Sequence, residues 1–185
     1  MRLNVARTWY RPDWACAGSI QNPFDWESRK MRAFYQWLAA MKERNVDIAL
    51  QAAWWFPRDM HHGFQAPQPE RDLPRYVEWV SESLHQLIEL RGFTNIRYLI
   101  AFTEPTQSSA GPLPPGETQW SYYVKTVRAL HDRLAADKRR GLVKLVAPNN
   151  GLDARHLKEA VSQLNDIVDV YSGHTYNKAG YEGWL

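Results

Sequence analysis

The sequence predicts an α/β fold in which five parallel strands and four intervening helices form part of a (β/α)8 barrel, or TIM barrel. Three observations lead to this fold class. Strand-like and helix-like segments alternate along all 185 residues. The strand-like segments are near-continuous apolar runs, as in strands that are buried on both faces. Aromatic and polar residues cluster just after the strands, at the end where barrels hold their active sites.

A doubly wound open sheet fits the same alternation. No glycine-rich phosphate loop follows any strand of the sequence, which weakens a nucleotide-binding interpretation. We find neither an internal repeat nor a linker. The sequence therefore predicts a single unit over residues 1–185.

The predicted elements follow one another in regular order. The five strands are expected at 2–9, 46–54, 97–102, 142–148 and 167–176. The four helices are expected at 27–45, 72–92, 119–139 and 154–165. Each helical segment has apolar residues three and four positions apart, which is the pattern of a helix with one buried face. Each helix is therefore expected to return the chain for another parallel strand.

Capping residues fix the predicted starts of the first two helices. Asp25 is the predicted N-cap of the first helix and Asp72 that of the second, because a carboxylate there accepts hydrogen bonds from free backbone N–H groups. Pro74 fits the first turn of the second helix, and Gly92 ends that helix.

Composition argues against several classes of partner. The net charge of +3 is too small to indicate nucleic acid, and the one dense basic run, residues 138–140, is predicted to be a solvated helix end. No stretch reaches the roughly 18 apolar residues of a membrane span. Cys16 is the single cysteine, so no internal disulfide forms. No signal peptide is visible and a strand follows Met1 directly, so a truncated N-terminus is expected and the compartment stays open.

Histidines do not predict a metal site. His61 and His62 are adjacent, so their side chains point apart on an extended backbone, and their spacing from His174 does not suit zinc. The sequence therefore predicts no metal and no cofactor.

Candidate site residues lie at or after the ends of all five predicted strands. They are Arg7, Trp9 and Trp14 after the first, Trp54 after the second, Thr103 and Glu104 after the third, Asn149 after the fourth, and His174 and Tyr176 on the fifth. In a barrel these positions meet at one face. Nine Trp and nine Tyr are a high aromatic content, and flat aromatic rings suit sugar rings as well as core packing. Trp14 and Trp54 are the preferred sugar platforms.

Two of these positions have competing interpretations. Glu104 follows an apolar run and precedes Pro105, which fixes the backbone behind it. A carboxyl group partly removed from water has a raised pKa, as a general acid needs near neutral pH. A solvated loop glutamate fits the spacing equally well. Residues 149–151, Asn-Asn-Gly, are predicted to form a turn, and the alternative is that their amides bind a substrate.

The strand ending in Glu104-Pro105, followed two strands later by the sequence DVYSGHTY, resembles the (β/α)8 glycoside hydrolases of clan A, which include cellulase-, mannanase- and xylosidase-like families. The resemblance implies a retaining hydrolase of β-linked saccharides with Glu104 as acid/base. It implies that Arg7 supports the nucleophile and that His174 and Tyr176 line the catalytic subsite. It also maps the five strands onto barrel strands 2 to 6, so strand 1 and strands 7 and 8 are expected to be missing.

The sequence departs from the clan A pattern in two places. Thr103 stands where those enzymes typically have Asn, whose amide bonds the sugar 2-hydroxyl. A retaining mechanism also needs a second carboxylate about 5 Å from the first, which clan A places on strand 7. Asp13 is the nearest alternative, but its RPDW loop is predicted to make a turn. We therefore expect a hydrolase fragment with little or no retaining activity of its own.

Further hypotheses remain open. One is a non-catalytic carbohydrate-binding barrel in which Thr103 marks lost activity. The other is an unrelated (β/α) metal-dependent hydrolase. For the clan A hydrolase and for the carbohydrate-binding barrel alike, the expected partner is an oligo- or polysaccharide. The chain is also expected to self-associate, because five strands of an eight-stranded barrel leave two open sheet edges.

Overall fold

The computed structural model describes residues 4–52, 69–101, 113–151 and 154–174. In this part of the chain five strands form one parallel sheet in the order β1-β2-β3-β4-β5. The strands are β1 (Val5–Tyr10), β2 (Asp47–Ala52), β3 (Ile96–Ile100), β4 (Lys144–Gly151) and β5 (Val170–His174). The α-helices are α1 (Arg29–Glu43), α2 (Pro69–Leu84), α3 (Gln119–Ala136) and α4 (Ala154–Leu164). The predicted alternation and parallel pairing are confirmed.

Three short helices complete the described elements. The 3-10 helix η1 (Pro12–Trp14) follows β1, and the 3-10 helix η4 (Arg140–Leu142) precedes β4. The π-helix η3 (His85–Leu90) continues α2 directly. Gly92 follows it with a φ of +68°, a left-handed conformation that glycine adopts without strain, as predicted for the helix end.

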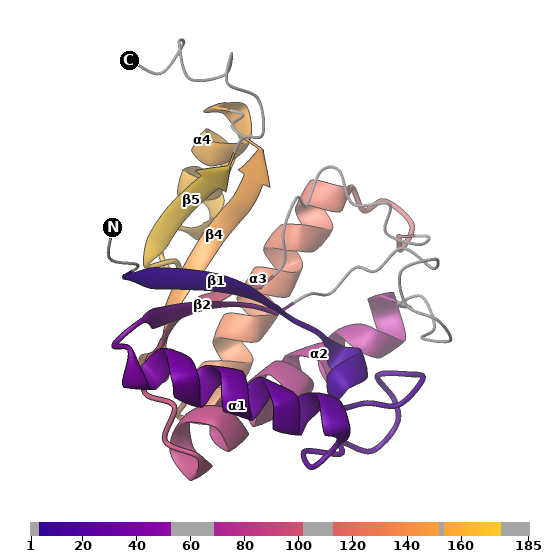
Figure 1. Cartoon of the computed structure of the whole chain (residues 1–185). Coiled ribbons are helices and arrows are strands. Elements are labelled where there is room, and N and C mark those ends of the chain that lie inside the picture. The colour runs from indigo at the N-terminus through magenta and orange to yellow at the C-terminus, as the bar shows by residue number, and fades with distance from the viewer. Residues whose placement is uncertain (1–3, 53–68, 102–112, 152–153, 175–185) are drawn as a thin grey trace.

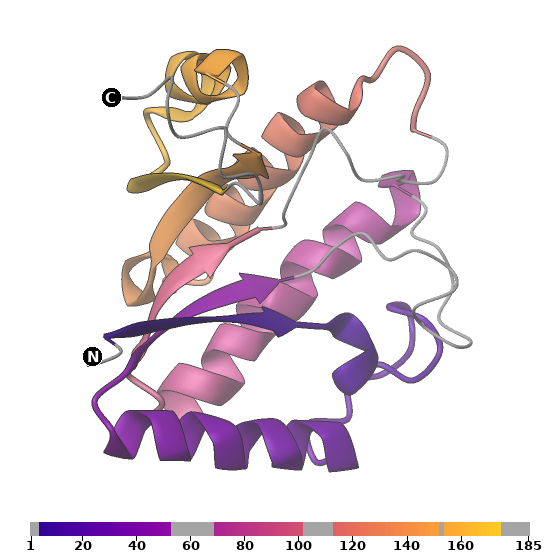
Figure 2. The ribbon, with the colours of Figure 1, turned by 45° about the horizontal axis from the view of Figure 1, so that its top comes forward.

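The α-helices pack along one side of the curved sheet (Figures 1 and 2). The main core lies between the two layers, and aromatic rings dominate it where α1 and α2 meet β1. The Tyr10 ring stacks on Trp79 of α2 with centroids 4.9 Å apart and on Phe34 of α1 at 5.3 Å. Stacked aromatic pairs add stability beyond the burial of their area.

The opposite side of the sheet carries no helix among the described residues. We call it the inner face and define it by Val5, Arg7 and Trp9, which alternate along β1 with side chains that face the helices. Val5 is 43% exposed and Trp9 is 47% exposed, whereas the neighbouring Tyr10 is fully buried. A sheet that buries its helix side and curls around its inner face is the geometry of a barrel wall.

β1 and β5 lie at the two ends of the strand order, and each pairs with one neighbour in the described sheet. The predicted self-association through these edges stays a prediction.

Both predicted helix caps are wrong. The N-cap of α1 is Ser28, whose Oγ accepts a hydrogen bond from the Met31 N–H at 3.1 Å. Asp25 instead accepts from the Glu27 N–H at 3.0 Å and forms a local turn before the helix. α2 begins at Pro69, so Asp72 lies inside it. There the Asp72 carboxylate is buried and accepts a hydrogen bond from Gln21 Nε2 at 2.7 Å.

Two further expectations are wrong, one for the end of β4 and one for the basic segment before it. Residues 149–151 are the last residues of β4 rather than a turn, because Asn149, Asn150 and Gly151 pair in register with β5. The basic run at 138–140 is not simply solvated. The Arg139 side chain is only 14% exposed and forms ion pairs with Glu82 at 2.8 Å and Glu89 at 3.2 Å, so it ties the segment after α3 to α2 and η3.

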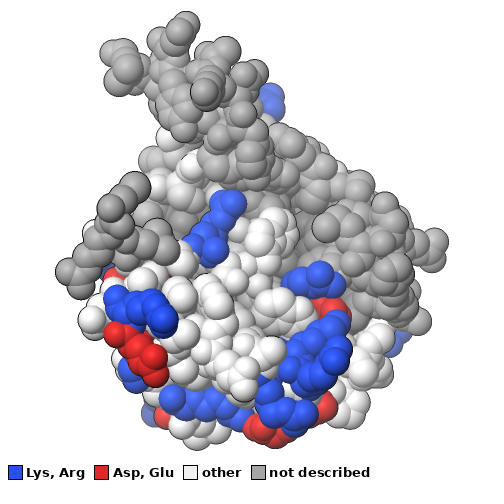
Figure 3. All heavy atoms as spheres, viewed as in Figure 1, with Lys and Arg blue, Asp and Glu red and all other residues white. Residues whose placement is uncertain are grey.

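Charged side chains of both signs are mixed along the rim of the molecule where α1 lies (Figure 3). Around the strands in the same view the surface carries few charges. No single-sign patch extends over the described residues of this face.

Tyr76 of α2 fixes the carboxyl ends of β2 and β3. Its buried hydroxyl donates to the carbonyl oxygen of Ala52 at 2.9 Å and also contacts the carbonyl oxygen of Ala101. Ala52 and Ala101 are the last described residues before the segments that carry Trp54 and Glu104. One side chain on the helix layer therefore sets where two candidate segments leave the sheet.

Replacing Tyr76 with Phe is expected to lower the free energy of unfolding by about 1–3 kcal/mol, because two buried carbonyl groups lose the one hydroxyl that they share. Denaturant-induced unfolding of both proteins measures this loss. Tyr171→Phe is the matched control, since its hydroxyl bonds Asn165 at an exposed position and its loss should cost under about 0.5 kcal/mol. Equal midpoints for Tyr76→Phe and wild type would contradict the role of Tyr76.

Candidate active site

Three polar side chains from three strands meet on the inner face. Arg7 of β1 donates from Nη1 to Oδ1 of Asn149 on β4 at 3.3 Å. Asn149 in turn donates from Nδ2 to Oε1 of Gln51 on β2, also at 3.3 Å. We call Arg7, Gln51 and Asn149 the inner cluster. It lies toward the carboxyl ends of the strands, where barrel enzymes hold their sites.

The inner cluster also measures how strongly the sheet curls. β1 and β4 are three steps apart in the strand order, which on a flat sheet is about 14 Å. Strand side chains stand roughly perpendicular to the sheet, so on a flat sheet the tips of Arg7 and Asn149 would stay about that far apart. Their hydrogen bond therefore crosses the concave interior, which only a barrel-like curvature brings within reach.

Gln51 is the site residue that the sequence analysis missed. It is fully buried, and its Nε2 has no hydrogen-bond partner in the described part of the chain. Its Cα pairs in register with that of Trp9, which places it on the inner face. A glutamine in the middle of the apolar run from Ile48 to Ala53 was the available signal, since a buried amide needs partners that an apolar strand does not supply.

Arg7 brings a positive charge to the inner face. Its side chain is exposed, and no carboxylate of the described residues lies within ion-pairing distance of it. One guanidinium nitrogen bonds the neutral Asn149 amide, so N–H donors remain for an anionic or hydroxyl-bearing ligand.

The two tryptophans at the end of β1 have different surroundings. Trp9 lies on the inner face two residues from Arg7 and is 47% exposed. Trp14, in η1, is partly buried and packs on the helix side, with its ring 5.8 Å from Tyr10 and 5.1 Å from Phe34. Its placement fits core packing, whereas Trp9 has the exposed ring that a sugar platform needs.

The remaining predicted residues are only partly covered by the description. Trp54, Thr103, Glu104 and Tyr176 lie outside the described residues. His174 is the last residue of β5, and its Cα pairs in register with Gly151. The structure therefore brings together Arg7, Asn149 and Trp9 from the predicted set, and the roles of the others stay predictions.

Asp13 forms ion pairs away from the inner face. It lies in the loop that was predicted to make a turn. It lies in η1 and its carboxylate binds Arg11 at 2.8 Å and Lys30 of α1 at 2.6 Å. These two ion pairs anchor the end of β1 to the helix layer. Asp13 is therefore a poor candidate for a nucleophile.

Cys16 is not a reactive thiol. Its side chain is fully buried, and burial raises the pKa of the thiol to about 12. The neutral thiol is a weak nucleophile and a weak metal ligand. No cluster of three metal-ligating side chains is present among the described residues.

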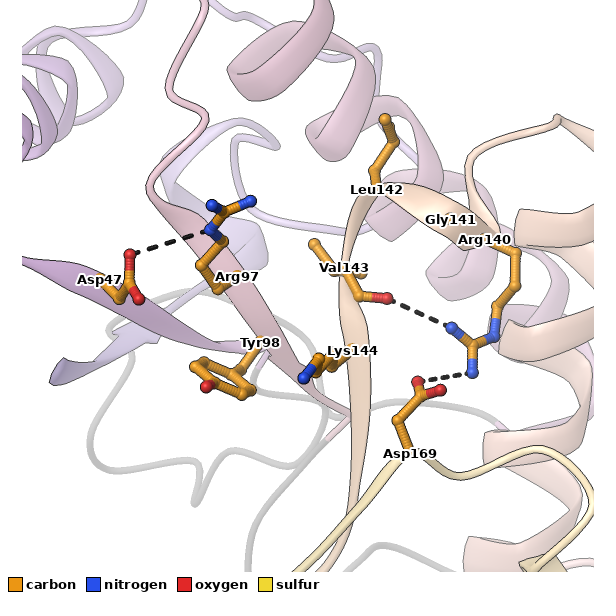
Figure 4. Close-up of a pocket in the computed structure, with 9 residues that line it drawn as sticks. All are labelled: Asp47, Arg97, Tyr98, Arg140, Gly141, Leu142, Val143, Lys144 and Asp169. Atoms are coloured by element: carbon orange, nitrogen blue, oxygen red, sulfur yellow. Dashed lines mark hydrogen bonds and ion pairs between the residues drawn. The ribbon is translucent and has the colours of Figure 1, made fainter.

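A separate hollow of about 500 Å³ lies at the amino ends of the strands, lined in part by Asp47, Arg97 and Lys144 (Figure 4). Arg140 and Asp169 also line it (Figure 4). Arg140 donates to Asp169 at 2.7 Å and to the Ile167 carbonyl at 2.8 Å, and Asp169 accepts from the Leu145 N–H at 2.7 Å. These contacts join the starts of β4 and β5. Contacts at this end of a barrel serve stability.

None of the helices in the described ranges combines the length and apolar character required to cross a bilayer.

Comparison with known proteins gives a fold rather than a family. No protein-family model matches the sequence, and no curated protein sequence matches it. Solved structures do match. A glucosidase from Croceicoccus marinus aligns with a TM-score of 0.63 at 13% identity. The catalytic domain of the GH30 xylanase C from Talaromyces cellulolyticus aligns with a TM-score of 0.60 at 12% identity. A cellulase–inhibitor complex aligns with a TM-score of 0.51 at 10% identity.

These alignments cover nearly all of this chain and much less of its neighbours. They cover 93%, 94% and 98% of this chain, but 37% of the glucosidase, 44% of the xylanase and 55% of the cellulase. The chain therefore has the fold of part of a glycoside hydrolase barrel, as the sequence predicted. At these identities the likeness extends to the fold alone.

Proposed function

We propose that this chain carries the acid/base and much of the sugar-binding wall of a retaining glycoside hydrolase for β-linked saccharides. The observation that carries the proposal is the inner cluster. It gathers a cation and two amides on the concave face of a partial barrel, beside the exposed ring of Trp9. The solved structures that share the fold of the chain include a glucosidase and a xylanase. Glu104 follows the last residue of β3 by four residues in the sequence, and its place beside this cluster is part of the proposal.

Each group has a chemical task in this proposal. Trp9 stacks on the apolar face of a sugar ring, since aromatic rings offer large rigid contact area. Glu104 protonates the leaving oxygen and then activates water. Arg7 orients the nucleophile and favours its ionised form, because a guanidinium beside a carboxyl group stabilises the carboxylate. His174 and Tyr176 line the same subsite. The nucleophile itself is proposed to come from a strand beyond those described.

Trp9 provides the first test. We expect the chain to bind one of cellohexaose, xylohexaose or mannohexaose, and Trp9→Ala to weaken that binding about tenfold, or about 1.4 kcal/mol. Isothermal titration calorimetry measures both affinities. Because Trp9 is half exposed, its removal leaves the core intact.

Leu90→Ala is the matched control, because Leu90 is a 60% exposed apolar residue on η3 and away from the inner face. Unchanged affinity in the Trp9 variant, or no binding of any of the three saccharides by wild type, would overturn the proposal. Binding without hydrolysis by any longer product of the same gene would favour the non-catalytic carbohydrate-binding barrel.

A further inference from the structure

Gln51 presents an unusual feature for a sheet residue. Its amide is fully buried inside an apolar strand, yet its Nε2 has no partner in the described part of the chain. An unpaired buried donor opposes folding, so a residue of this kind at this depth needs an explanation other than stability. Methionine or leucine would fill the same space without that cost.

The contact that Gln51 does make supports one orientation of the Asn149 amide. Gln51 Oε1 accepts from Asn149 Nδ2, which leaves Asn149 Oδ1 turned toward Arg7 Nη1. If the Asn149 amide were flipped, its NH₂ group would face the guanidinium and two donors would oppose each other. Because the guanidinium has donors only, Arg7 needs Asn149 Oδ1, and Gln51 Oε1 stabilises that amide orientation by accepting from Asn149 Nδ2.

We propose that Gln51 is a positioning residue that sets the direction of the Arg7 guanidinium, acting through Asn149. The inference rests on the proposed saccharide site, and it adds a residue to it. Arg7 and Trp9 lie two positions apart on the same face of β1, about 7 Å along the strand. A sugar ring stacked on Trp9 thus brings its oxygens near Arg7. Holding the guanidinium in place before binding removes an entropic cost that an unrestrained arginine would incur.

Gln51→Met distinguishes positioning from a structural role. It keeps the side-chain length, removes the acceptor for Asn149 and also removes the unpaired donor. A positioning role predicts an unfolding temperature within about 2 °C of wild type. The lost hydrogen bond to Asn149 lowers stability, and removal of the unpaired buried donor offsets that loss. A positioning role also predicts a shifted and broadened NMR signal of the Arg7 side-chain N–H groups, assigned with Arg7→Lys, and about tenfold weaker hexasaccharide binding.

Two controls sharpen the test. Gln51→Glu keeps an oxygen acceptor for Asn149 and, at a pH where its carboxyl group is protonated, is expected to retain the wild-type Arg7 signal. Gln36→Met makes the same substitution at an exposed position of α1 and should change neither the Arg7 signal nor binding.

The outcomes separate the two proposals. An unchanged Arg7 signal in Gln51→Met, or a fall in unfolding temperature of more than about 8 °C, would overturn the positioning role. If wild type binds none of the three hexasaccharides, the proposed function fails. The Arg7 signal then decides the inference alone, with a change supporting it and no change refuting it.

Discussion

Replacing Glu104 with Gln is expected to lower kcat/KM about 10²- to 10⁴-fold on glycosides with poor leaving groups, because the departing oxygen loses its proton donor. The experiment uses the chain together with whatever coding sequence flanks it in the source DNA. The amide keeps the size of the side chain and removes only the transferable proton.

The leaving group makes this test specific for an acid/base residue. A dinitrophenolate departs without a proton, so Glu104→Gln should form the glycosyl intermediate from dinitrophenyl glycosides at nearly the wild-type rate. Glu43→Gln at the end of α1 is the matched control and should leave both substrates unaffected. Equal loss on both substrates, or no loss on either, would refute the assignment of Glu104. We expect the 185-residue chain alone to hydrolyse neither.

Raising the pH from 7 to 11 is expected to remove roughly 7 kcal/mol of stability, enough to unfold a typical domain. Burial raises the pKa of the Cys16 thiol to about 12 and raises the pKa values of Tyr10, Tyr76 and Tyr123 well above their ordinary value. The folded state therefore keeps protons that the unfolded chain releases above about pH 9. This stability is fully present below that pH and is lost as the pH rises toward the folded-state values.

The contribution of each group to this loss follows from the difference between the pH and the pKa of that group in the unfolded chain. At pH 11 Tyr10, Tyr76 and Tyr123 contribute about 1.4 kcal/mol each and Cys16 contributes about 3 kcal/mol. Tyrosinate absorbance at 295 nm and circular dichroism, followed together, measure the effect. The buried tyrosines should ionise only as the structure is lost.

Cys16→Ala serves as the internal check on alkaline unfolding. It removes one buried acid, so the fall of unfolding free energy between pH 9.5 and 11 should become shallower by about 1.4 kcal/mol per pH unit. Titration of all tyrosines near pH 10 with retained circular dichroism would contradict the prediction.

The barrel wall could be predicted from sequence because its signals are local. The runs at 46–54 and 97–102 are mostly apolar, with Asp47, Gln51 and Arg97 as the exceptions. The helical stripes place Met31, Phe34 and Leu38 on the buried face of α1. Each signal depends only on residues within a few positions of one another. A local pattern of this kind can be recognised without knowing how distant parts of the chain fold.

The predictions that failed depended on distant partners. Asp72 has the composition of a helix cap, but Gln21, 51 residues earlier, binds its carboxylate inside α2. Residues 149–151 have the composition of a turn, but pairing with β5 holds them as strand. Gln51 was overlooked because its partner, Asn149, is 98 residues away. Arg7 and Asn149 were both predicted as site residues. Their contact could not be predicted, because it depends on the curvature of the sheet.

The spacing of the inner cluster along the chain has a consequence for biosynthesis. Arg7 and Asn149 are 142 residues apart, so at 5–20 residues per second Asn149 is made about 7–30 s after Arg7. The stack of Tyr10, Phe34 and Trp79 needs only the first 79 residues. The helix-side core of the nascent chain can therefore form while Arg7 still faces solvent, and the inner cluster is completed only after Asn149 has been made.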